Sequence, residues 1–246
     1  PFFPSSESFR GSYLLDQTKA IQSNSNFNLL VIILSPFLKK SFGNYKIEGI
    51  KCKTFKIFDL PSFILPGLFN SINFKRLIKF LETNNIKVNN KTIIHGHINY
   101  PSLDFLDFFS RKFSCKTILQ HHGLDVLQKR TGLSIPFFKH FQNKYILRHF
   151  NKLSLNITAH IAVSSVVKSN LIEINSKLEN KIYVCINGVD TTKFYKNSLK
   201  NINKTKFTIG CVANFWEIKD QITLLKAVNI LKEEGINNLQ IRFVGS

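Results

Sequence analysis

The sequence predicts an α/β protein built on parallel β-sheets, and three observations indicate this fold class. Apolar runs of strand length recur along the 246 residues. Patterns typical of helices separate these runs, an alternation that favours parallel strands joined by helices. The runs contain few charged residues, as expected when helices cover both faces of a sheet.

The expected strands begin with a wholly apolar run at residues 29–34, and the later runs follow the same plan. In chain order they lie at 29–34, 54–58, 91–95, 116–120, 160–164, 181–185, 208–212 and 239–244. The expected helices lie at 12–22, 73–84, 102–113, 135–151, 165–175 and 221–234. Helices of this length can carry the chain from the end of one strand back to the start of a parallel one.

One polar segment interrupts the alternation. Residues 190–206 are rich in Asn and Lys and show no helical period, which is typical of a surface linker. We therefore expect a first α/β domain at 1–195, a linker at 196–206 and, at 207–246, the opening βαβ unit of a second α/β domain. The chain has no Met and ends directly after an apolar run, so we expect a piece of a longer protein.

The composition is that of a globular protein with a strong positive charge. Hydrophobic residues make up 43% and charged residues 20%, which excludes gross disorder. The 34 Lys and Arg against 15 Asp and Glu give a net charge of +19, which attracts nucleic acid, anionic lipid or a phosphorylated substrate. A general enrichment in Lys, Asn, Ile and Phe explains the same charge equally well.

The cysteines are far apart and have apolar or β-prone neighbours; they are Cys52, Cys115, Cys185 and Cys211. This pattern favours buried thiols in a reducing compartment over disulfides or a zinc site. No apolar stretch reaches the roughly 20 residues of a membrane span, and no signal peptide is visible. The expectation is a cytoplasmic protein without a metal or cofactor.

Candidate binding residues follow the expected strands, because ligands of parallel α/β sheets bind beyond the carboxyl ends of the strands. His95 and His97 end one strand, and we expect their imidazoles to point to opposite faces. A loop His bonded to nearby backbone is the commoner reading of such a pair. His122 ends the next strand, where Asp125 could hold the imidazole or cap a helix.

Further candidates could contact phosphate. Gly11, in a Ser-rich loop, would let a backbone amide approach an anion, although the loop has too few glycines for a nucleotide-binding fingerprint. Ser164 ends a strand before a helix N-terminus, a position that suits phosphate, but helix capping by Ser165 also explains the pair.

The last candidates lie at the domain junction and after it. Asn187 and Gly188 are a pair typical of a turn. Their position at the junction of the two expected domains makes them candidates for binding. Lys219 precedes the helix expected at 221–234, where it would add a cation to the helix dipole.

In this order and spacing, these sites resemble the GT-B glycosyltransferases of the group 1 (family 4) type. The most specific piece is Asn187-Gly-Val-Asp190 followed by Phe194, similar to the "NGVD…F" that the family carries before its second domain. Residues 122–125 resemble the family's "HG-x-D" element. The resemblance covers nearly the whole chain and implies two Rossmann-like lobes, the acceptor-side lobe at 1–195 and the nucleotide-sugar lobe from 207. The family's first strand would precede residue 1.

The resemblance implies transfer of a sugar, with retention, from a nucleotide-sugar donor to a cell-surface glycan or glycolipid. His122 would be catalytic and lie near the transferred sugar. The implied donor-binding residues are Gly11, Ser164, Asn187, Gly188 and Lys219. The acceptor-side candidates are His95, His97 and Asp125.

Three further points come from the resemblance. No metal is implied, because protein cations and helix ends would neutralise the diphosphate. Asn214 stands where many relatives carry an Arg, so a second cation is missing there. The family's glutamate pair would lie beyond Ser246, so residues 1–246 alone would be inactive.

Three alternatives stay open at this stage. Residues 129–152 combine basic residues with aromatic ones, which would suit the inner face of an anionic membrane or equally a core helix with solvated charges. A nucleic-acid-binding protein is motivated by the charge alone, since no zinc-finger, RRM or helix-turn-helix pattern occurs. A nucleotide-sugar epimerase of the same fold is the nearer alternative.

Overall fold

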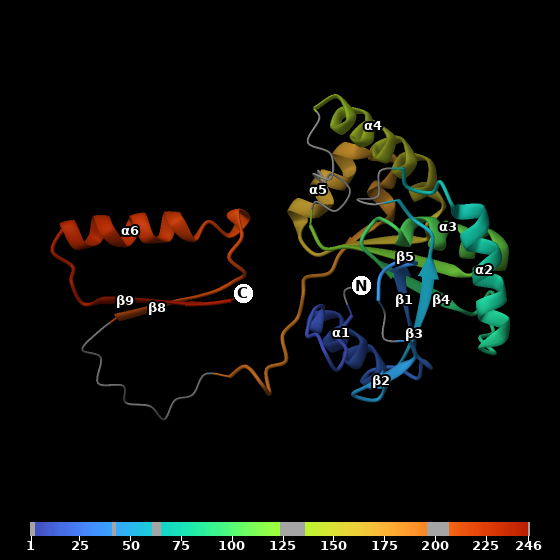
Figure 1. The fold of residues 1–246 in the computed structure, drawn as a ribbon, viewed down its shortest axis with the longest axis horizontal. Coiled ribbons are helices and arrows are strands. Elements are labelled where there is room, and N and C mark those ends of the chain that lie inside the picture. Colours follow the sequence, from blue (N-terminus) through green and yellow to red (C-terminus); the bar gives the residue numbers. More distant parts are fainter. Residues whose placement is uncertain (1–2, 41–42, 61–64, 124–135, 196–206, 246) are drawn as a thin grey trace. The chain divides into compact units, whose positions relative to one another are not determined.

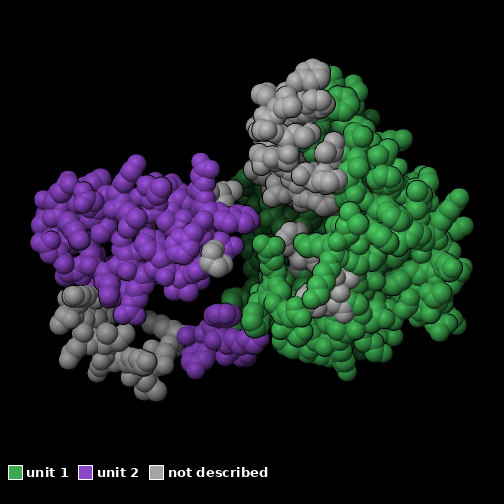
Figure 2. All heavy atoms as spheres, in the orientation of Figure 1, with its two compact units in different colours: residues 1–190 green, residues 191–246 purple. Residues whose placement is uncertain are grey.

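The computed structural model describes residues 3–40, 43–60, 65–123, 136–195 and 207–245. The chain forms two compact units, residues 1–190 and 191–246, which are described separately (Figures 1 and 2). The expected linker at 196–206 lies outside the described residues.

The first sheet of unit 1 has three strands in the order β1-β3-β2. Helix α1 (Ser12–Ser23) leads into β1 (Leu30–Pro36), and β3 (Ile50–Ile57) runs parallel to β1 before helix α2 (Asn70–Thr83). A short strand that was not expected from the sequence, β2 (Tyr45–Ile47), pairs with β3 in the antiparallel direction. Glu48 and Gly49 join the two strands with φ angles of 46° and 87°, as a two-residue hairpin turn requires.

The second sheet of unit 1 is wholly parallel, as predicted, with strand order β4-β5-β6-β7. Its strands are β4 (Ile93–His97), β5 (Lys116–His121), β6 (Ala159–Ala162) and β7 (Ile182–Val184). The helices between them are α3 (Ser102–Phe113), α4 (Pro136–Leu153) and α5 (Ser165–Ile174), with short 3-10 helices η2 (Ser154–Asn156) and η3 (Ser176–Lys181).

Helices pack on both faces of the three-stranded sheet. Ile50 and Cys52 of β3 belong to the core cluster that includes Leu15 of α1. Phe55 and Ile57, an odd number of positions further along the strand, point the other way and pack with α2 and α3. Helix α3 also contributes residues to the core of the four-stranded sheet, so it packs on both sheets.

Unit 2 contains one βαβ unit, as predicted. Strands β8 (Phe207–Val212) and β9 (Leu239–Val244) are parallel and paired along their whole length. Helix η4 (Glu217–Lys219) and helix α6 (Gln221–Glu233) connect them.

The cysteine prediction holds in part. Cys52 and Cys115 are buried thiols, and Cys211 is half-buried. The prediction is wrong for Cys185, which is exposed because it follows β7, the outer strand of its sheet. None of the helices in the described ranges combines the length and the apolar character that crossing a membrane requires.

Candidate functional site

The candidates of unit 1 gather where the parallel strands of the four-stranded sheet end, an edge that we call the carboxyl edge. His97 is the last residue of β4, and His122 follows the last residue of β5. Ser164 comes two residues after β6, and Asn187 comes three residues after β7. Because all four strands run in one direction, these residues share one edge of the sheet.

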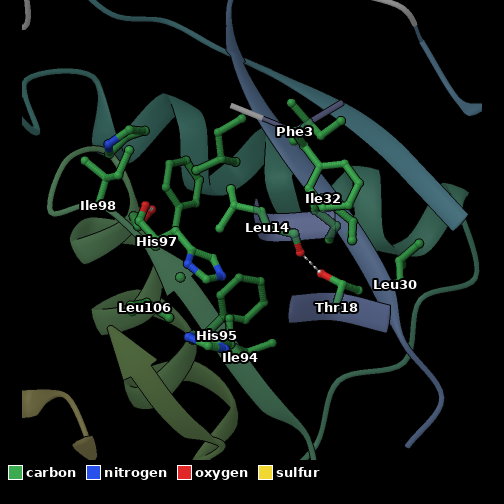
Figure 3. A pocket seen from close by; sticks show the side chains of 18 of the residues that line it. Phe3, Leu14, Thr18, Leu30, Ile32, Ile94, His95, His97, Ile98 and Leu106 are labelled. Carbon is green, nitrogen blue, oxygen red and sulfur yellow. Dashed lines mark hydrogen bonds between the residues drawn. The ribbon is translucent and has the colours of Figure 1, made fainter. Parts of the chain in front are cut away.

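The structure brings three of the predicted histidines into a cluster. Nδ1 of His97 lies 3.0 Å from Nε2 of His122, at hydrogen-bond distance. The rings of His95 and His97 are stacked with centroids 4.4 Å apart (Figure 3). The expectation that these two imidazoles point to opposite faces is wrong, because residues two positions apart on a strand share a face.

Burial keeps two of these rings uncharged. Desolvation lowers the pKa of His95 to about 4 and that of His97 to about 3. His97 is therefore neutral at pH 7 and offers His122 either a donor or an acceptor at Nδ1. If a neutral His122 accepts a hydrogen bond at Nε2, its own ring hydrogen is on Nδ1. If it donates from Nε2, the ring hydrogen is on Nε2. The contact with His97 thus couples the tautomer of His122 to that of His97.

The two adjacent histidines at the end of β5 have different surroundings. His121 is fully buried, and its Nε2 lies 3.1 Å from Nδ1 of His160. His160 in turn contacts the carbonyl of Ser154 at 3.0 Å. His121 and His160 therefore belong to the core, whereas His122 belongs to the carboxyl edge.

Two residues of α1 join the cluster that sequence reasoning had not assigned to a site. The ring of Tyr13 meets His122 edge-on, with centroids 5.1 Å apart. Nε2 of Gln17 donates to Oε1 of Gln120 at 2.7 Å. Their spacing of four residues, which places both on one helix face, is the signal that could have identified them.

These contacts bring the start of α1 to the carboxyl edge. Gly11 directly precedes the helix with a φ of 81°, a left-handed conformation that suits glycine. The backbone N–H groups of the first helical turn carry the positive end of the helix dipole. The contact between Tyr13 and His122 thus joins the first turn of α1 to the end of β5, although the two are far apart in the sequence.

Ser164 is the N-cap of α5. Its Oγ accepts a hydrogen bond from the backbone N–H of Val167 at 3.2 Å. The interpretation of Ser165 as the cap is wrong, since Ser165 is the first residue of the helix. The start of α5 is a second helix N-terminus at the carboxyl edge.

Asn187 and Gly188 are exposed and form no turn. Gly188 does not adopt the left-handed conformation that an Asn-Gly turn would require. The interpretation of this pair as a turn is therefore wrong, while its place after β7 remains as expected. Asp125 lies outside the described residues.

Lys219 belongs to unit 2, where it ends η4 directly before α6. Its side chain is exposed. Asp220 caps α6 by accepting from the N–H of Thr223 at 3.3 Å. Lys219 therefore directly precedes the capping residue of α6, at the positive end of that helix.

The described part of the basic and aromatic segment belongs to α4, whose aromatic side chains range from fully buried to 56% exposed, the latter at Phe141. Phe150 is fully buried, and the hydroxyl of Tyr145 donates to the carbonyl of Pro66 at 3.2 Å. Lys144 and Arg148 are exposed on the same helix. Lys129 and Arg130, the first basic residues of the segment, lie outside the described residues. In the described ranges, no three His, Cys, Asp or Glu side chains are grouped as metal ligands would be.

Comparisons with known proteins find similarity both in sequence and in structure. No family model matches the chain. The chain is 27% identical over 195 residues to the "Capsular polysaccharide biosynthesis glycosyltransferase CapH" of Staphylococcus aureus. This alignment covers 78% of the chain and 47% of CapH, so the chain spans about half the length of this relative. A glycosyltransferase structure from Rickettsia africae ESF-5 is 18% identical with a TM-score of 0.49, over 79% of this chain and 55% of that one.

Proposed function

We propose that this chain is part of a glycosyltransferase that moves a sugar from a nucleotide-sugar donor to a growing glycan or its lipid-linked precursor. The observation that carries the proposal is the meeting of His122 with His97 and with the first turn of α1 at the carboxyl edge. The sequence similarity to CapH over 195 residues supports the same reaction class.

His122 is the residue that we assign to the transferred sugar. An imidazole held in one tautomer presents a defined donor or acceptor to a sugar hydroxyl. The Nδ1 atom of His97 contacts the ring of His122 and holds it in place, and the ring of His95 stacks on that of His97. We therefore propose that His95 and His97 position His122, which differs from the acceptor contact expected from sequence.

Helix N-termini and one lysine are the groups that we assign to the donor diphosphate. The starts of α1 at Gly11 and of α5 at Ser164 offer backbone N–H groups to an anion. Lys219 offers a full charge at the start of α6. Charge of this kind stabilises the departing nucleotide diphosphate without a metal ion, and we propose transfer with retention at the anomeric carbon.

The experiment uses the full-length protein with a panel of UDP-, GDP-, dTDP- and CMP-sugars and lipid-linked acceptors. We expect glycosylated acceptor with at least one donor, and no transfer by residues 1–246 alone. Free sugar isomers without transfer would point to an epimerase instead. No product with any donor would contradict the proposal.

Two variants test the assigned residues with the donor so identified. His122→Ala is expected to lower kcat by about 100-fold or more. Lys219→Ala is expected to lower kcat/KM by a similar factor, whereas Lys226→Ala, an exposed lysine of α6, leaves it unchanged. Equal effects of the two lysine variants would remove Lys219 from the diphosphate site.

A further inference from the structure

The turn that follows β1 presents apolar side chains to solvent. Leu38 is 96% exposed and Phe37 is 50% exposed. The backbone N–H of Phe37 donates to the carbonyl of Ile57 at 2.8 Å, and that of Lys39 donates to the carbonyl of Pro36 at 3.0 Å. The backbone of the turn is therefore tied to the end of β3, and the two apolar side chains project from it.

The start of α2 presents two more apolar side chains near this turn. Leu68, just before the helix, is 56% exposed, and Ile72, in its first turn, is 49% exposed. Helix α2 packs beside β3 (Figure 1). Arg76 lies on the same helix face as Ile72, because the two are four residues apart. The guanidinium carbon of Arg76 lies 5.6 Å from the ring centroid of Phe37, so this helix face and the turn meet.

Aromatic rings pack together at the base of these side chains. The ring of Phe58 stacks on that of Phe37 with centroids 4.8 Å apart, and the guanidinium carbon of Arg76 lies 4.7 Å from the centroid of Phe58. Arg76 also donates to the carbonyl of Lys56 at 2.7 Å. The ring of Phe69 lies 6.5 Å from that of Phe58. The turn and the start of α2 therefore share one packed base, above which the exposed aliphatic side chains stand.

Basic residues surround the exposed apolar ones. They are Lys39, Lys40, Lys75, Arg76 and Lys79, of which the four lysines are exposed. Residues 36–40 and 65–79 contain no Asp or Glu. Asp59, between the two segments, accepts a hydrogen bond from the hydroxyl of Tyr100 at 3.2 Å, and Glu82 lies near the far end of α2. The surface is therefore apolar at its centre and positively charged around it.

We propose that this surface, formed by Phe37, Leu38, Leu68 and Ile72 with the five basic residues, docks on an anionic membrane. We call it the apolar-basic surface. Its aliphatic side chains enter the boundary between the lipid headgroups and the acyl chains, where they leave water. Its ammonium groups contact lipid phosphates, and the long lysine side chains allow them to stay at the level of the headgroups.

Nucleic acid is another anionic partner that the charge would attract, and the apolar side chains disfavour it. Single-stranded nucleic acids stack their bases on aromatic faces, whereas the ring of Phe37 already contacts Phe58 and Arg76. Leu38, which is almost fully exposed, is aliphatic. Such a side chain gains free energy from contact with acyl chains and gains none from contact with phosphate.

This proposal does not depend on the glycosyltransferase assignment, and sedimentation with vesicles tests it. The protein is mixed with vesicles of phosphatidylcholine alone or of equal parts of phosphatidylcholine and phosphatidylglycerol. We expect sedimentation with the mixed vesicles only, and release as the salt concentration rises. Sedimentation with neither kind of vesicle overturns the proposal, as does equal sedimentation with both.

A neutral substitution tests whether the apolar centre makes the contact. Leu38→Gln keeps the net charge and is expected to lower the partition coefficient onto the mixed vesicles about tenfold. Val166→Gln is the matched control, because Val166 is a 66% exposed aliphatic residue of α5. An unchanged coefficient in Leu38→Gln, or an equal loss in Val166→Gln, contradicts the proposed surface.

A charge reversal tests the basic residues. The double variant Lys39→Glu with Lys40→Glu is expected to lower the partition coefficient by at least about tenfold. Lys144→Glu with Arg148→Glu makes the same change of charge on α4 and is expected to have a smaller effect. An equal loss in the α4 variant would move the membrane contact to α4, and binding of an RNA oligonucleotide by a protein that ignores both kinds of vesicle would replace the membrane by nucleic acid. Unchanged melting temperatures show that the variants, all at exposed positions, are folded.

Discussion

Strands β5 and β1 are parallel strands of the same unit, and they differ in how far they are buried. In β5, Thr117, Leu119, Gln120 and His121 are buried, although two of these residues are strongly polar. In β1, which contains five consecutive apolar residues from Leu30 to Leu34, most residues are only half-buried. Among the strands that the structure describes, β5 lies between two others and β1 beside one. Burial therefore follows the number of neighbouring strands more closely than it follows the apolarity of the sequence.

The comparison predicts unequal costs for two similar truncations. Leu119→Ala in β5 is expected to lower the free energy of unfolding by about 3 kcal/mol, because Leu119 is fully buried in the core. Ile32→Ala in β1 is expected to cost about 1 kcal/mol, because Ile32 is half-buried and lines a cavity of about 590 Å³. Urea unfolding followed by far-UV circular dichroism measures both. Equal losses of unfolding free energy in the two variants would contradict the link between burial and the number of neighbouring strands.

Strand β4 also has one neighbouring strand, but its histidines are desolvated, which predicts a pH dependence. The pKa values of His95, about 4, and His97, about 3, lie below the ordinary 6.5. Below pH 6.5 the unfolded chain takes up protons that the folded chain does not, so stability is lost as the pH falls. Each histidine contributes a loss of about 1.6 kcal/mol between pH 6.5 and 5, so we expect about 3 kcal/mol for the two.

The control for this pH effect is His97→Phe, which removes one of the two groups. The loss of stability between pH 6.5 and 5 is expected to fall to about half in this variant. An unchanged pH dependence would mean that water reaches the rings of β4 and that they titrate normally.

Helix α1 is preceded by Gly11 in the left-handed backbone conformation, and a third variant tests how much this glycine contributes to stability. Gly11→Ala is expected to cost about 1–2 kcal/mol, because φ is 81° at this position. Gly188→Ala is the matched control, with no left-handed φ and no atom within 4 Å of an added Cβ, and is expected to be neutral. Thermal unfolding of both variants measures the difference. Similar melting temperatures would show that α1 contributes little to the stability of the β1 region.

The helix between β6 and β7 starts with a side-chain cap, and its loss is the smallest predicted effect. Ser164→Ala is expected to cost about 1 kcal/mol, because the N–H of Val167 loses its acceptor. Ser165→Ala is the control, since this exposed residue lies within the helix. A larger loss at Ser165 would reverse the assignment of the cap.

The sequence was informative about the elements and less so about their pairing. Helix α3 has the predicted bounds, because its apolar pattern is strong and its last turn is basic. Helix α2 begins at Asn70 and not at Asn73, since no side chain caps it and its start has no clear signal. Strand β2 was not predicted, because its three residues, Tyr45-Lys-Ile47, form no apolar run.

For the candidate site, the position of His122 at a strand end was predictable, whereas its contacts were not. The approach of His97 depends on the pairing of β4 with β5, in which His97 lies opposite Gln120. That register arises when the two strands pair in the folded sheet, and the sequence of neither strand determines it alone. The contacts of Tyr13 and Gln17 depend in turn on how α1 packs against the sheet.

Within the described residues, β1 has a neighbouring strand on one side only, which has a practical consequence for concentrated samples of the protein. An apolar, uncharged strand with exposed backbone groups is a template for association between copies and for precipitation during purification. Residues 29–34 have this composition. Concentrated samples are therefore expected to form oligomers through β1, and a charged substitution there would improve solubility at the expense of the fold.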